Sequence, residues 1–205
     1  MSSIIDTAIQ CLRDESQALI DLIPTIGADF QHAVELILQC PGKVIVTGVG
    51  KSGHIGAKIA ATLSSTGTPS FFINPLDAFH GDLGVIGTED LVLAISNSGE
   101  TDELLRFFPY LLARQIPVIG MSGNEKSLLA QYSSVHLNIS VKKEACPMGL
   151  APTTSTTVTL ALGDALACAL IVARDFKASD FAQFHPGGAL GRRLLTCAKD
   201  VMHTD

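Results

Sequence analysis

The stretch KVIVTGVGKSGHIG, Lys43–Gly56, joins a short apolar run to a glycine-rich turn that carries a lysine and a serine. Similar apolar runs recur later, separated by helix-length segments, at 70–73, 91–96, 118–122 and 135–140. Runs that are apolar on both faces are typical of parallel strands with helices on both sides. With a first strand at 43–47, the sequence predicts an α/β fold: a three-layer sandwich with a five-stranded parallel sheet.

The segments outside the predicted sheet have helical patterns. Two amphipathic patterns open the chain, at about 5–23 and 29–40, with Asp29 as the expected N-cap of the second. A long helix is expected at about 154–173 and a short one at about 178–184. The apolar part of the long helix is shorter than the roughly 20 residues that a membrane span needs. We therefore expect a buried helix, with its Asp164 as a buried, hydrogen-bonded structural acid.

Composition narrows the class of protein. The chain has 205 residues, of which 47% are hydrophobic, and a mean hydropathy of +0.36, which suits one substantial core. A net charge of −6 and a pI near 5.4 provide no basic face, which argues against a nucleic-acid partner. The five cysteines have no CxxC spacing, and the N-terminus carries charge where a secretory signal is apolar. A soluble protein of the reducing cytoplasm, with no membrane partner, is expected.

The glycine-rich turn matches two nucleotide-binding fingerprints incompletely. A P-loop would need its first glycine where Ile45 stands. The dinucleotide pattern G-x-G-x-x-G fits Gly48, Gly50 and Gly53, but the second strand ends at Asn74 instead of an acid. The turn still suits an anion, because glycines allow close backbone approach and a helix N-terminus presents free N–H groups. A packing turn is the alternative, although it would have little use for a lysine and a serine at its apex.

A second loop adds hydroxyl groups to this prediction. The segment SNSGETDE, 96–103, follows the third apolar run and places three hydroxyls where a strand becomes a helix. An ordinary N-cap needs only one hydroxyl, whereas several beside free backbone N–H groups describe a phosphate cradle. One cradle and one lysine suit a single phosphate monoester. The expected phosphate-binding residues are Gly50, Ser52, Ser96, Asn97, Ser98 and Thr101.

These two motifs, together with HGDLG, EACPMGLAPTTST and FHPGGALGRRLL, resemble those of the sugar isomerase (SIS) domain. Within that family they resemble the arabinose-5-phosphate isomerases, and the resemblance covers about residues 40–202. It implies a flavodoxin-like SIS domain at 41–198, preceded by N-terminal helices at 1–40 that pack on the domain or on a neighbouring subunit. In longer family members a tail like 199–205 leads into a pair of CBS domains. The tail is therefore expected to be the start of an absent CBS region or the end of a naturally short chain.

The resemblance also implies an activity. Such enzymes interconvert D-ribulose 5-phosphate and D-arabinose 5-phosphate through an enediol and supply 3-deoxy-D-manno-octulosonate (KDO) biosynthesis. It implies a homotetramer that binds a small pentose phosphate and needs neither a cofactor nor a metal. Paralogues that serve lipopolysaccharide, capsule or sugar-alcohol pathways share these motifs, so the pathway stays open.

The chemistry of aldose–ketose isomerisation requires a carboxylate base, electrophilic help and groups that open the sugar ring. By resemblance Glu103 and Glu144 are active-site acids; we favour Glu103 as the base, and Glu144 lies in a loop where no helix dipole is expected. His80 and His185 are implied in ring opening or proton relay, and Lys51 in polarising the carbonyl or holding a hydroxyl. The two histidines have no zinc-site spacing, so they are expected at most as adventitious metal ligands.

Other polar residues receive weaker assignments. Residues 153–156 open the long helix, and because capping needs one hydroxyl, the others are expected to face the ligand. His54 is expected to pack beside the glycine-rich turn, and His32 and His203 are expected to be solvated.

Two other classes of function remain as alternatives. One is a regulatory SIS module that binds a sugar phosphate without catalysis, as in some transcription regulators. The roughly 40 residues ahead of the domain are short for a helix-turn-helix and contain no basic recognition helix. The other is a nicotinamide enzyme, but this sequence lacks the acid that would bind the ribose of the cofactor.

Overall fold

The structure is a computed structural model, and it describes residues 3–187. Residues 188–205 lie outside the described part of the chain. The second half of the FHPGGALGRRLL motif, the predicted tail, His203 and the last of the five cysteines, Cys197, are therefore not placed.

The centre of the fold is a five-stranded parallel sheet with the strand order β2-β1-β3-β4-β5. The strands are β1 (Val44–Gly48), β2 (Ser70–Ile73), β3 (Leu91–Ile95), β4 (Val118–Ser122) and β5 (Val135–Asn138). The predicted sheet is confirmed, with boundaries that differ by at most two residues. β1, β3 and β4 are buried along their whole length, which is why they appear in the sequence as continuous apolar runs.

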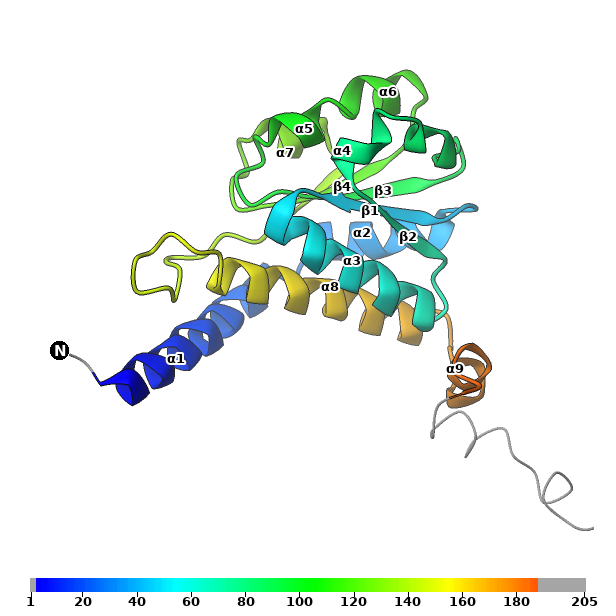
Figure 1. The fold of residues 1–205 in the computed structure, drawn as a ribbon. Coiled ribbons are helices and arrows are strands. Elements are labelled where there is room, and N and C mark those ends of the chain that lie inside the picture. The colour runs from blue at the N-terminus through cyan, green and yellow to red at the C-terminus, as the bar shows by residue number, and fades with distance from the viewer. Residues whose placement is uncertain (1–2, 188–205) are drawn as a thin grey trace, which may run out of the picture.

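Helices cover both faces of the sheet and complete the three layers (Figure 1). One face carries α2 (Ala28–Gln39), α3 (Gly50–Ser65) and α8 (Thr154–Ala173), with α1 (Ile4–Leu22) packed against α8. The other face carries short elements: α4 (Pro75–Ala78), η2 (Asp82–Val85), α5 (Asp102–Leu105), α6 (Phe108–Ala113) and α7 (Leu128–Tyr132). The single turn η1 (Ile23–Thr25) follows α1, and α9 (Ala178–Phe184) follows α8.

The apolar side chains form one core on each face of the sheet. Ile59 of α3 and Leu166 of α8 belong to the first core, and Phe107 and Leu111 of the α5–α6 region belong to the second. All four are at most 1% exposed. Burial of such a side chain stabilises the fold by about 1.5–3 kcal/mol. The elements that carry the loops at the strand ends are therefore fixed from both sides.

The beginning of α2 differs from the prediction. The helix starts at Ala28 with Gly27 as its N-cap, so Asp29 lies in the first turn and is not the cap. A carboxylate there still favours the helix, because the N-terminal end of the helix dipole is positive.

The outer face of α8 differs from the prediction as well. Asp164 is not buried: its side chain is 43% exposed and forms an ion pair with Lys58 of α3. In addition, Val172 is 80% exposed. Among the described helices, α8 has the length and apolar composition of a membrane span, a property that it shares with core helices of soluble proteins. α8 packs on α3, α1 and α2, and its outer face near the C-terminal end, which includes Cys168 and Val172, is exposed within the described chain.

The order of the strands defines where a ligand can enter. After β1 the chain forms β2 on one side of it, and then returns to form β3 on the other side. In open parallel sheets this reversal leaves a crevice at the carboxyl ends of the two strands that flank it. The loops that follow β1 and β3 therefore border the expected binding position.

Candidate active site

A cavity of about 320 Å³ lies at the crevice that the strand order predicts. It is formed by the first turn of α3, the loop between β3 and α5, and the first turns of α8. The residues that line it are Val49, Lys51, Ser52, Ile55, Asn97, Ser98, Thr101, Pro152, Ser155, Thr156 and Thr159. The start of a helix or the loop before one forms each wall, so free backbone N–H groups are available around the cavity.

The α3 wall depends on close packing between the helix and β1. Gly50 has a φ of 59°, a conformation that side chains rarely adopt, and it turns the chain into α3. A Cβ at Gly53 would lie 2.6 Å from the carbonyl oxygen of Gly48, so only glycine lets the first turn sit this close to the strand end. Lys51 is exposed and Ser52 half-buried, and both line the cavity.

The wall between β3 and α5 is held by a network of hydroxyl groups. The Ser96 side chain accepts a hydrogen bond from the Gly99 N–H at 3.0 Å and pairs with the Thr101 hydroxyl at 2.7 Å. The Ser98 hydroxyl accepts from the Glu100 N–H at 3.1 Å. Ser96 is 3% exposed and does not line the cavity, whereas Ser98 and Thr101 do. The buried Ser96 hydroxyl therefore fixes the loop, and the side chains of Ser98 and Thr101 line the cavity.

The α8 wall corrects one inference made from the sequence. Glu144 does face a helix N-terminus: its carboxylate accepts hydrogen bonds from the Thr153 N–H at 2.8 Å and the Ser155 N–H at 3.2 Å. The hydroxyls of Thr153 and Ser155 also donate to it. Partial burial alone would raise the pKa of Glu144, but these hydrogen bonds, led by the one from the Ser155 hydroxyl, hold that pKa below its usual range. Glu144 thus caps α8 across the loop.

The structure brings together about half of the predicted site. Lys51, Ser52, Asn97, Ser98 and Thr101 share the cavity, Gly50 adjoins it, and Ser96 lies behind it. Glu144 touches the cavity through the Ser155 hydroxyl, which lines it. Of the residues at 153–156, Ser155 and Thr156 line the cavity; the Ser155 hydroxyl donates to Glu144 and the Thr156 hydroxyl donates to the Thr153 carbonyl oxygen.

Glu103, His80 and His185 do not line this cavity. Glu103 is half-buried in the single turn of α5, and His80 is exposed between α4 and η2. His185 stacks on Phe181 with ring centroids 3.9 Å apart, and its Nδ1 lies 2.9 Å from the Phe181 carbonyl oxygen. It ends α9, beyond the C-terminal end of α8, whereas the cavity lies at the N-terminal end of that 20-residue helix (Figure 1). At 1.5 Å per residue, α8 separates the two positions by about 30 Å.

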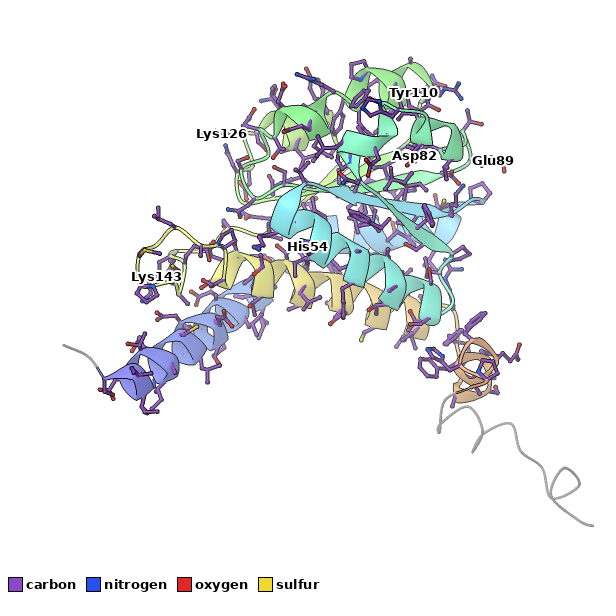
Figure 2. All side chains as sticks on the ribbon, viewed as in Figure 1. His54, Asp82, Glu89, Tyr110, Lys126 and Lys143 are labelled. Carbon is purple, nitrogen blue, oxygen red and sulfur yellow. The ribbon has the colours of Figure 1, made fainter. Side chains whose placement is uncertain are left out.

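Two remaining predictions concern residues around the cavity. His54 lies exposed on the first turns of α3 (Figure 2), so it is not packed beside the turn. Thr159 lines the cavity although the sequence analysis did not select it. Its position one helical turn after Ser155 is the signal that could have identified it, because residues four apart share a face of a helix.

The arrangement suits an anion with several oxygen atoms. Hydroxyl groups, backbone N–H groups and one ammonium group surround the cavity, and no carboxylate or imidazole is among its described lining residues. In the described part of the chain no cluster of three or more His, Cys, Asp or Glu side chains could hold a metal ion. The chain's own groups are thus adapted to bind one end of a ligand, such as a phosphate.

Comparisons with known proteins agree with this fold. The SIS domain model matches residues 37–169. The chain is 56% identical over 195 residues to "Arabinose 5-phosphate isomerase KdsD" of Yersinia pestis, covering 95% of this chain and 60% of that protein. It is 58% identical over 189 residues to the protein of the same name from Pseudomonas aeruginosa, covering 92% of this chain and 58% of that protein. The structure of Escherichia coli CFT073 c3406 in complex with arabinose 5-phosphate is similar, with a TM-score of 0.87 and 40% identity, covering 91% of this chain and all of that one.

The chain belongs to the SIS domain family. It spans about 60% of the length of the curated relatives that it matches.

Proposed function

We propose that this chain is the isomerase domain of an arabinose-5-phosphate isomerase, which interconverts D-ribulose 5-phosphate and D-arabinose 5-phosphate and supplies KDO biosynthesis in the cytoplasm. The observation that carries the proposal is the hydroxyl-lined cavity at the strand reversal, which suits a single phosphate group. The names of the relatives, at 53–58% identity, support the pentose phosphate as the substrate.

The cavity assigns a binding role to the residues that line it. The hydroxyls of Ser52, Ser98 and Thr101 donate hydrogen bonds to the phosphoryl oxygens, and the N-terminal N–H groups of α3 complement their charge. Lys51 lies at the cavity wall and polarises the carbonyl or holds a hydroxyl of the bound sugar. Fixing the phosphate in this way orients the far end of a five-carbon chain without any contact to the reacting atoms.

The reaction is a proton transfer between neighbouring carbons. A carboxylate removes a proton from C1 of the ketose, the electrons form the enediol, and a proton returned to C2 gives the aldose. We assign the base to Glu103, because Glu144 is already engaged in four hydrogen bonds and has a lowered pKa, which makes it a weak base. His80 and His185 are assigned to opening the ring and moving protons between the sugar oxygens.

The catalytic groups of one chain do not meet at its cavity, which supports an oligomeric active site. His185 lies about one α8 length from the cavity within its own chain. Of the two histidines, we assign His185 of each site to a neighbouring chain in a homotetramer. The exposed apolar side chains of α1 and of the outer face of α8, among them Ile5, Leu12 and Val172, support such an assembly.

The test is turnover in deuterated water. The chain incubated with D-ribulose 5-phosphate in the presence of a chelator is expected to yield D-arabinose 5-phosphate with deuterium at C2, detected by NMR. Deuterium at C2 reports the protonation of an enediol, and activity with the chelator reports a metal-independent reaction. Binding of the pentose phosphate without turnover would contradict the proposal and favour a regulatory module.

A further inference from the structure

Glu100 is an acid inside the loop that is proposed to bind a phosphate, and its position there needs a physical reason. It stands two residues after Ser98 and one before Thr101, and both of those side chains line the cavity. A carboxylate near a phosphate weakens the binding of that phosphate, because like charges repel. The site described above gives no role to Glu100. Its carboxylate therefore either weakens the site or serves it in another way.

The Glu100 side chain reaches the turn that joins β4 to α7, and it does not line the cavity. Its Oε1 accepts a hydrogen bond from the backbone N–H of Leu128 at 2.9 Å. Leu128 is the first residue of α7, so this N–H has no partner within the helix. The carboxylate thus binds a free N–H group 28 residues further along the chain.

The backbone of the phosphate loop is bonded to the same turn. The Gly123 N–H donates to the Asn97 carbonyl oxygen at 2.9 Å, and the Leu129 N–H donates to the Gly99 carbonyl oxygen at 3.1 Å. These two bonds join main-chain atoms. The third bond between loop and turn comes from the Glu100 side chain, so it is the one that a substitution in the loop removes.

Buried hydroxyl groups hold the turn itself in place. Ser122 and Ser127 are both 0% exposed, and both hydroxyls donate to the Asn124 carbonyl oxygen, at 3.0 and 2.7 Å. The Ser122 hydroxyl also pairs with Nε2 of His136 on β5 at 2.8 Å. Gly99 packs so closely on the turn that a Cβ there would lie 2.4 Å from the Ser127 Cβ. The turn is therefore a fixed support for the loop.

Glu100 also contacts Ser98 directly through its own backbone. The Ser98 hydroxyl accepts a hydrogen bond from the Glu100 N–H at 3.1 Å, which leaves the hydroxyl proton available for a ligand. Because this N–H and the carboxylate belong to one residue, the bond to Leu128 also fixes the group that orients Ser98.

We propose that Glu100 is a positioning residue of the phosphate site: by accepting from the Leu128 N–H, its carboxylate holds the loop in the shape that presents Ser98 and Thr101 to the ligand. The inference rests on the proposed function in taking that ligand to be a sugar phosphate. It predicts an effect opposite in sign to that of simple electrostatics. Loss of the charge alone strengthens phosphate binding, whereas loss of the hydrogen bond weakens it.

Three substitutions separate the charge from the hydrogen bond. Glu100→Gln removes the charge and keeps an oxygen that accepts from Leu128, and Glu100→Ala removes both. Leu128→Pro keeps the carboxylate and removes the N–H. Proline suits the first residue of a helix, and Ser127 before it already has the extended conformation that proline requires, with φ −65° and ψ 159°.

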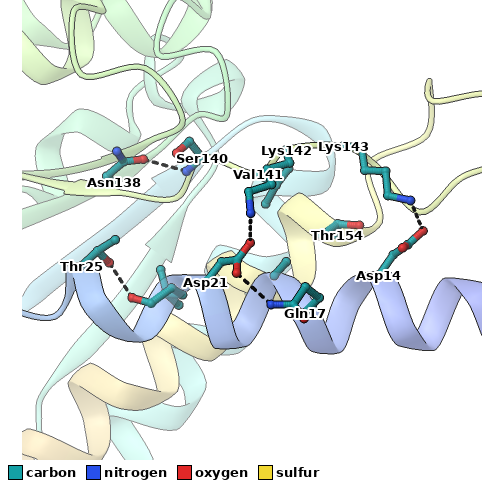
Figure 3. A pocket seen from close by; sticks show the side chains of 12 residues that line it. Asp14, Gln17, Asp21, Thr25, Asn138, Ser140, Val141, Lys142, Lys143 and Thr154 are labelled. Carbon is teal, nitrogen blue, oxygen red and sulfur yellow. Dashed lines mark hydrogen bonds and ion pairs between the residues drawn. The ribbon is translucent and has the colours of Figure 1, made fainter.

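Glu125→Ala is the matched control. Glu125 is exposed on the same turn, and its Oε1 accepts from the Asn138 side chain at 2.7 Å. Asn138 ends β5, and its side-chain oxygen accepts from the Ser140 N–H at 2.8 Å (Figure 3). The control therefore removes a carboxylate from the turn and leaves the three bonds to the phosphate loop intact.

The measurement is the Kd for D-arabinose 5-phosphate and for inorganic phosphate, by calorimetry on the whole chain, together with KM and kcat. Glu100→Ala and Leu128→Pro are each expected to raise both Kd values about three- to tenfold, the effect of one hydrogen bond, with a smaller change in kcat. The double variant should bind no more weakly than either single variant, because both changes remove the same bond. Glu100→Gln and Glu125→Ala are expected to leave Kd unchanged or to lower it.

Unchanged or tighter binding in Glu100→Ala would overturn the proposal, and so would a Glu100→Gln variant that binds as weakly as Glu100→Ala. Circular dichroism checks the fold of each variant, and the two Glu100 variants decide the question by themselves if Leu128→Pro unfolds. Pentose phosphate that binds to the unaltered chain without turnover would contradict the proposed isomerase alone, because the Kd values still test Glu100. An unaltered chain that binds neither ligand would overturn both proposals.

Discussion

Ser98 and Ser96 show how neighbouring hydroxyls divide two tasks. Ser96 is 3% exposed and fixes the loop by accepting from the Gly99 N–H, while Ser98 faces the cavity. A Cβ at Gly99 would lie 2.1 Å from the Ser127 hydroxyl oxygen, and the φ of 70° disfavours a side chain as well. Changes at Ser96 or Gly99 therefore act through the shape of the loop, whereas a change at Ser98 acts on the ligand.

Ser98→Ala is expected to raise the KM for the pentose phosphate by roughly ten- to hundredfold with a smaller change in kcat. A hydrogen bond to a charged group contributes about 1.5–3 kcal/mol, and the phosphate does not take part in the proton transfer. Steady-state kinetics measures both constants, and Ser179→Ala, at an exposed position on α9, is the matched control. An unchanged KM would remove Ser98 from the phosphate site.

The start of α8 forms one wall of the candidate active site, and Glu144 fixes it in place. Glu144 satisfies two backbone N–H groups at this helix end and holds the Ser155 hydroxyl at the cavity wall. Because folding lowers the pKa of Glu144, its carboxylate adds stability above the unfolded pKa of about 4.3. That contribution is lost as the pH falls through the lower, folded value.

Glu144→Gln is expected to lower the free energy of unfolding at pH 7 by about 1–2 kcal/mol, as the loss of a helix cap does. Below about pH 4.5 the unaltered chain should lose stability relative to the variant, so that the two curves approach each other. Denaturant unfolding across pH measures this difference.

Glu103→Gln is the contrasting variant: it should lower kcat at least about a hundredfold, as loss of a general base does, and leave the stability almost unchanged. The opposite pattern, with kcat lost in Glu144→Gln at full stability, would move the base to Glu144.

The elements differ in how far the sequence could predict them. The strands and α8 were predictable because continuous apolar runs leave few alternatives. The cap of α8 was not, because Glu144 is nine residues ahead of Thr153 and reaches the helix only through the path of the loop. The exposed position of Asp164 was missed for a related reason. A helix that is apolar all round appears buried in sequence, and its uncovered face becomes visible only once its neighbours are placed.

At the scale of the whole molecule, the described chain leaves apolar surface uncovered. Ile4, Leu12 and Ile23 are 66–89% exposed along α1 and at its end, and Val172 is 80% exposed on α8. Under the proposed function, these exposed apolar side chains of α1 and α8 are buried at interfaces between subunits. The separation of His185 from the cavity has the same explanation under the proposed function.

A tetramer predicts a mass in solution of four times 21.6 kDa by light scattering. Leu12→Glu should shift the mass toward smaller species and reduce turnover, while circular dichroism stays unchanged. A mass of 21.6 kDa for a fully active chain would rule out an active site shared between subunits.

The central claim is that α3, the loop after β3 and the start of α8 hold one phosphate group between them. A crystal structure of the chain with bound D-arabinose 5-phosphate tests it most directly. We predict the phosphorus atom within hydrogen-bonding reach of Ser52, Ser98 and Thr101, with the sugar extending away from them. A phosphate group bound at any other loop of the sheet would contradict the account.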